Sequence, residues 1–124
     1  MRGFTLEDAM DAIVLEAHRA SADAGWWDGA DMYNDKHIVP AKICLIHSEL
    51  SEAMEGHRKD LMDDKLPHRK MIEVELADAV LRIADLAGKL DLDLGGALTE
   101  KLAFNARRPD HKKENREKEG GKSY

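Results

Sequence analysis

Residues 71–86 read MIEVELADAVLRIADL, a stretch with the periodicity of an amphipathic helix. At about 100° per residue, one stripe of this helix consists of Met71, Glu75, Asp78, Arg82 and Asp85. Apolar residues border the stripe on both sides, namely Ile72, Leu76, Ala79 and Ile83 on one side and Val74 and Leu81 on the other. The pattern therefore predicts a helix whose acidic stripe is set between apolar surfaces.

A second acidic pair occurs in residues 47–58, HSELSEAMEGHR, where Glu49 and Glu52 share the i, i+3 spacing of Glu75 and Asp78. That spacing places both carboxylates of a pair on one helix face. Ionised carboxylates that are brought together repel, and hard divalent cations with oxygen ligands are the usual compensation. The four acids predict a Mg²⁺ site, in which Mn²⁺ can substitute, although either pair alone is typical of an ordinary solvated face.

The composition predicts an all-α protein of one domain, because 124 residues suit a single core and helix-forming residues are frequent. A net charge of −6 disfavours nucleic-acid binding. The single cysteine, Cys44, excludes an internal disulfide and suits a reducing compartment. Residues 1–10, MRGFTLEDAM, lack the apolar run of a signal peptide, and no apolar stretch is long enough to span a membrane. We expect a soluble cytoplasmic protein.

Four helices are expected from the pattern of caps and breakers. They run from about Thr5 to Ala24, from Pro40 to about Lys59, from about Pro67 to Leu86 or Gly88, and from after Asp93 to before Pro109. Residues 1–111 would form the domain, and the polar residues 112–124 would form a mobile tail.

Two further groups are candidates for ligand binding. Lys101, Asn105 and Arg108 share a helix face and are able to hold phosphate oxygens, although a solvated basic face is an equally simple interpretation. Trp26 and Trp27 lie in an irregular loop over residues 25–37, where one of them can stack on a nucleobase or plug the core. No histidine follows an acid by three residues, and neither HExxH nor CxxC occurs, which disfavours di-iron and zinc sites.

The order Glu49-x-x-Glu52, a gap of 22 residues, then Glu75-x-x-Asp78 resembles the ExxE…ExxD signature of the all-α NTP pyrophosphohydrolases. This superfamily includes MazG, dimeric dUTPases, dCTP pyrophosphatases and phosphoribosyl-ATP pyrophosphatase. The resemblance covers roughly residues 40–123 and is strongest to the short stand-alone MazG-like proteins of phages and bacteria.

The resemblance implies a four-helix MazG-like bundle that assembles as a dimer or a dimer of dimers. It implies hydrolysis of a nucleoside triphosphate to the monophosphate and pyrophosphate, with Glu49, Glu52, Glu75 and Asp78 as metal ligands. Glu49 or Glu52 would also act as the general base, and Lys101 and Asn105 match a Lys…Asn pattern of many members. Many members carry EExxE in the first motif, whereas Ser48 precedes Glu49 here, which leaves the general base and the number of metals open.

The base and sugar specificity does not follow from this resemblance. Two alternatives also remain open: an enzyme of the phosphoribosyl-ATP pyrophosphatase type, and a catalytically silent helical protein that binds nucleotides or a partner.

Overall fold

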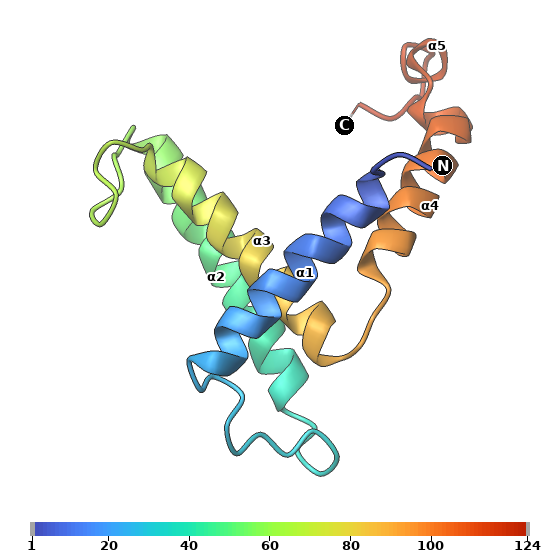
Figure 1. Ribbon diagram of the computed structural model, residues 1–124. Helices are drawn as coiled ribbons and strands as arrows, with labels where there is room; N and C mark the ends of the chain where they lie inside the picture. The colour runs from blue at the N-terminus through green and yellow to red at the C-terminus, as the bar shows by residue number, and fades with distance from the viewer. Residues whose placement is uncertain (1, 124) are drawn as a thin grey trace. The chain divides into compact units, whose positions relative to one another are not determined.

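The computed structural model describes residues 2–123, which form five α-helices and a short 3₁₀ helix (Figure 1). They are α1 (Leu6–Asp23), α2 (Ile38–Arg58), α3 (Met71–Lys89), α4 (Leu94–Arg107), η1 (Pro109–His111) and α5 (Lys113–Arg116). The described residues contain no strand beyond an isolated bridge between Met62 and Lys70. The expected all-α class is therefore confirmed. None of these helices combines the length and the apolar character needed to cross a membrane.

The chain divides into two compact units. The central unit, Ala12–Leu92, holds α2, α3 and the C-terminal part of α1, and it contains both acidic pairs. The terminal unit consists of Met1–Asp11 and Asp93–Tyr124 and contains α4, η1 and α5. The four-helix bundle stays a prediction, because α4 belongs to the terminal unit.

Local hydrogen bonds explain why the first and fourth helices begin where the sequence indicates. The Thr5 hydroxyl accepts the Asp8 N–H at 3.1 Å, and the Asp8 carboxylate accepts the Thr5 N–H at 3.0 Å, which is a capping box. Asp93 caps α4 by accepting the Gly96 N–H at 2.9 Å. Gly25, with φ +85°, follows α1 in the left-handed conformation that glycine adopts without strain.

The third helix begins at Met71, so the expected start near Pro67 is wrong. The physical reason is a turn centred on Asp63, whose Oδ2 accepts the N–H groups of Lys65 at 3.0 Å and Leu66 at 2.8 Å. An aspartate that bonds the backbone two and three residues ahead competes with helix formation. Pro67 follows this turn and lies outside the helix.

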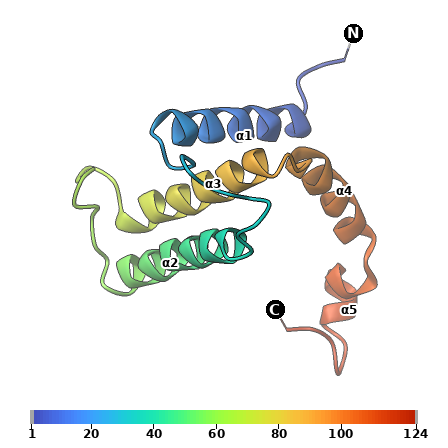
Figure 2. The ribbon, with the colours of Figure 1, turned by 90° about the horizontal axis from the view of Figure 1, so that it is seen from below.

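Helices α2 and α3 pack side by side in opposite directions, and both views show this pairing (Figures 1 and 2). Small residues allow the close approach: Ala53 and Ala79 are buried, and a Cβ atom added at Gly56 would lie 2.7 Å from Cγ of Met71. At the far end of α3, a Cβ atom at Gly88 would lie 2.6 Å from Cβ of His18. Glycine thus lets the C-terminal part of α1 contact α3.

Candidate metal centre

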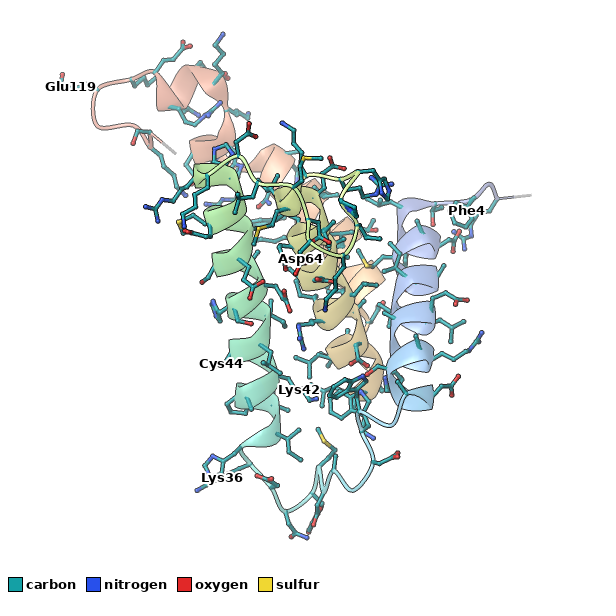
Figure 3. All side chains as sticks on the ribbon, turned by 90° about the vertical axis from the view of Figure 1, so that its left-hand side faces the viewer. Phe4, Lys36, Lys42, Cys44, Asp64 and Glu119 are labelled. Atoms are coloured by element: carbon teal, nitrogen blue, oxygen red, sulfur yellow. The ribbon has the colours of Figure 1, made fainter. Side chains whose placement is uncertain are left out.

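A cleft of about 1020 Å³ opens in the central unit, with walls from α1, α2, α3 and the loops that flank α2. In Figure 3, Lys42 lies on the side of α2 that faces α3, and Asp64 lies on the loop at the opposite end of these helices. Seven acidic residues line the cleft, namely Glu49, Glu52, Asp63, Asp64, Glu75, Asp78 and Asp85. Three basic residues join them, namely Lys42, Lys65 and Arg82. This excess of negative charge favours cations in the cleft.

The acidic pairs of α2 and α3 meet in this cleft. Glu49, Glu52 and Glu75 each offer a carboxylate oxygen, and these oxygens all lie within 4.8 Å of one another. Asp78, three residues after Glu75, lines the same cleft. Its pKa is raised, first by burial and then by the negative charges of Glu49 and Glu52. The structure thus brings together the four acids that the sequence singles out, three of them within the reach of one ion.

Glu75 is the most enclosed of the four carboxyl groups, at 8% exposed. Burial, the hydrogen bond with Glu49 and the charges of Glu52, Glu49 and Asp78 together raise its pKa to about 8. In the absence of a cation, Glu75 is therefore protonated at neutral pH, and its O–H group donates a hydrogen bond to the Glu49 carboxylate.

Glu49 carries the negative charge of this pair. The Arg82 Nε atom donates to Oε1 of Glu49 at 2.8 Å. Burial alone would raise the pKa of Glu49, but the hydrogen bonds from Glu75 and Arg82 outweigh it and lower the pKa below the usual value. One proton and one guanidinium group thus offset the charges of the Glu75–Glu49 pair when no metal is present.

The donor set of this cluster fits a hard divalent cation. Its members supply carboxylate oxygens alone, without the histidine nitrogens or cysteine sulfur that a zinc site uses. Without a metal, a proton and an arginine side chain offset part of the repulsion between these carboxylates. A divalent ion that binds them reduces the same repulsion. Mg²⁺ and Mn²⁺ are the cations that match such ligands.

The loop between α2 and α3 supplies two acids, Asp63 and Asp64, that are not among the candidate residues of the sequence analysis. Asp63 is 6% exposed, and its charge contributes to the raised pKa of Asp78. Asp64 also lines the cleft. The order Asp-Asp-Lys-Leu-Pro is a signal for a turn initiated by aspartate, and it is the signal that could have located Asp63.

The two tryptophans divide their roles. Trp27 is 7% exposed and donates its indole N–H to Oδ1 of Asp85 at 2.9 Å. Trp26 is 72% exposed, and both residues line the cleft that holds the acidic cluster. The Trp27 side chain is therefore largely enclosed within the wall of the cleft, while the Trp26 side chain remains largely accessible from solvent.

The candidate phosphate-binding residues lie in the terminal unit, on and just beyond α4. Because α4 ends at Arg107, Arg108 is not on the helix face expected for it. Its guanidinium donates to Asp110 at 3.0 and 2.6 Å and to the Asn105 side-chain oxygen at 3.5 Å. The Lys101 ammonium lies 4.8 Å from the centre of the Phe104 ring. Phosphate binding by Lys101, Asn105 and Arg108 stays a prediction.

No family model, curated protein or solved structure matches this chain.

Proposed function

We propose that the protein is a Mg²⁺-dependent nucleoside triphosphate pyrophosphohydrolase, which converts a (d)NTP to the (d)NMP and pyrophosphate in control of the nucleotide pool. The observation that carries this proposal is the convergence of Glu49, Glu52 and Glu75, whose oxygens lie within 4.8 Å of one another. The ExxE…ExxD signature, with Asp78 as its fourth acid, supports the same reaction class. The cleft also contains aromatic and cationic side chains, which a nucleotide needs.

The electrostatics of the cleft indicate how a triphosphate would bind. A polyanion is repelled by seven carboxyl groups unless cations intervene. When bound, Mg²⁺ would neutralise phosphate charge and lower the pKa of a water molecule. Glu49, Glu52, Glu75 and Asp78 would hold the ion, and Glu49 or Glu52 would accept the proton of the water that attacks the α-phosphorus.

The other candidate residues would bind the two ends of the substrate. Trp26 or Trp27 would contact the nucleobase, because an aromatic ring face offers stacking of about 1–3 kcal/mol per base. Lys101, Asn105 and Arg108 of the terminal unit are the further residues that we propose bind phosphate oxygens. Arg82 is a further cation in the cleft, and it would be released from Glu49 when a metal takes its place.

The decisive experiment measures pyrophosphate release from a panel of NTPs and dNTPs with Mg²⁺, and then with EDTA. We expect turnover that is lost when the metal is removed. Hydrolysis in ¹⁸O-labelled water should place the label in the monophosphate, because water attacks the α-phosphorus. Label confined to pyrophosphate or orthophosphate would contradict this mechanism. Nucleotide binding without turnover would instead indicate a catalytically silent binding protein. Turnover of phosphoribosyl-ATP alone would indicate an enzyme of the phosphoribosyl-ATP pyrophosphatase type.

We also propose that the protein functions as a homo-oligomer, a dimer or a tetramer. Large apolar side chains remain exposed on the helices of the central unit, including Ile43, Leu50 and Met54 on α2 and Leu76, Val80 and Ile83 on α3. These side chains recur at spacings of three, four or seven residues, so those of each helix share one face, and exposed apolar patches of this kind mark interaction surfaces. A second copy of the chain, which presents the same surface, would cover it.

Light scattering at micromolar concentration tests the oligomeric state. We expect a mass of two or four times the 13.9 kDa of one chain. Replacing Val80 with Glu would place a charge on the exposed apolar surface and should shift the mass towards that of one chain. A monodisperse 13.9 kDa species of the unaltered protein would overturn the proposal.

A further inference from the structure

Asp85 accepts hydrogen bonds from two aromatic side chains through a single oxygen atom. Its Oδ1 lies 2.9 Å from Nε1 of Trp27 and 2.9 Å from Nδ1 of His18. Trp27, in the loop before α2, is 58 residues from Asp85 in the sequence, and His18, on α1, is 67 residues away. One carboxylate on α3 thus anchors the C-terminal part of α1 and the loop that follows it to α3.

The Trp27 ring is enclosed by polar groups on several sides. The His18 ring meets it edge-on, with centroids 6.2 Å apart and planes at 66°. The ammonium groups of Lys42 and Lys89 lie 4.5 and 5.4 Å from the Trp27 ring. Trp27 has the largest side chain among the buried residues of the described chain. Within these contacts, the Asp85 carboxylate is the acceptor of the indole N–H.

Asp85 and Trp27 define one end of the cleft that holds the acidic cluster. Asp78 and Asp85 both line the cleft, and they are seven residues apart on α3, about 10 Å along the helix axis. The turn at Asp63 also lines the cleft, and its charge acts on Asp78. A nucleotide with its α-phosphate at the acids can therefore place its base against the Trp27 end, since a nucleoside has a comparable length.

We propose that Asp85 is a positioning residue that holds the Trp27 indole as the wall against which the nucleobase packs. This inference rests on the proposed nucleotide substrate. Asp85 suits the role because a carboxylate oxygen accepts two hydrogen bonds at once, and a bond to a charged acceptor is stronger than one between neutral groups. Asparagine retains one oxygen acceptor, whereas leucine has a similar volume and no acceptor.

The first test follows Trp27 without any ligand. In a Trp26→Phe background, Trp27 is the sole tryptophan and reports its own environment. Asp85→Leu should shift the emission maximum and increase quenching by acrylamide, because the indole N–H loses its acceptor. Asp85→Asn should restore most of the original signal. Glu16→Gln is the matched control, since Glu16 is exposed on α1 and does not line the cleft. Identical spectra for Asp85→Leu and the control would overturn the inference.

The second test separates the base end from the phosphate end by calorimetry. In Asp85→Leu the Kd of an α,β-imido nucleoside triphosphate with Mg²⁺ should rise about tenfold, because the Trp27 ring is no longer held in place at the base end of the cleft. The Kd of Mg²⁺–pyrophosphate, which has no base, should be unchanged. Equal weakening of both ligands, or of neither, would contradict the positioning role. An unaltered protein that binds no nucleotide would overturn the proposed function instead, and the emission test would still decide whether Asp85 holds Trp27.

Discussion

Replacing Glu75 with Gln is expected to lower the rate of NTP hydrolysis by about a thousandfold or more, which corresponds to several kcal/mol of transition-state stabilisation. Glutamine has the same shape, but it removes the negative charge with which Glu75 would hold a divalent ion next to Glu49 and Glu52. The same amide replacement at Glu52, or asparagine at Asp78, should have a similar effect. Steady-state kinetics with saturating Mg²⁺ measures the loss, and calorimetry with Mn²⁺ measures the accompanying loss of metal affinity.

The matched control for this experiment is Glu73→Gln. Glu73 lies on the same helix, is exposed, and pairs with Arg69 at 3.1 Å instead of with the cluster. It should retain both activity and metal affinity, because an exposed ion pair contributes little to stability. Full activity of Glu75→Gln would show that the acidic cluster does not carry the reaction.

In the absence of metal, the free energy of unfolding is expected to fall as the pH rises from 5 to 8. The pKa of Glu75 is about 8 in the folded protein and near 4.5 in a free side chain. Between these values the folded state retains a proton that the unfolded state has lost, so each pH unit lowers stability by about 1.4 kcal/mol. The raised pKa of Asp78 acts in the same direction, whereas the lowered pKa of Glu49 affects stability only at pH values below about 4.5, outside this range.

Urea unfolding in EDTA at several pH values measures this slope. Glu75→Gln has no proton to lose and should flatten the profile, with a difference of roughly 4 kcal/mol at most across three pH units. Mg²⁺ should restore stability at pH 8, because it binds the ionised cluster of the folded state alone. Parallel profiles for the variant and the unaltered protein would show that Glu75 ionises normally.

The convergence of Glu49, Glu52 and Glu75 could be anticipated from the sequence, because helical periodicity is a local property. The i, i+3 spacing in Glu49-x-x-Glu52 and Glu75-x-x-Asp78 is sufficient to place each pair on one helix face, and packing of α2 against α3 brings the faces together. The start of α3 was predicted wrongly, because the backbone bonds of Asp63 override the preference of Pro67 for a first helical turn.

The partners of individual side chains were beyond local sequence patterns. Arg82 and Asp85 were both placed on the acidic stripe of α3, but the stripe does not reveal that Arg82 pairs with Glu49 on α2. Asp85 likewise meets His18 and Trp27 through contacts that span more than fifty residues. Such contacts depend on which helices pack together and at what register, and periodicity within one helix carries no information about either.

The buried apolar residues of the described chain are mostly alanines, namely Ala17, Ala53, Ala79, Ala84 and Ala87, joined by Trp27 and Leu86. Methyl groups remove little apolar surface from water, and that surface determines the heat-capacity increment of unfolding. A single chain with this interior would melt with an unusually small increment. If copies unfold as they dissociate, the increment also includes the surface between them, and the melting temperature rises with protein concentration. Calorimetric scans at several concentrations would thus distinguish the heat capacity of the fold from that of its assembly.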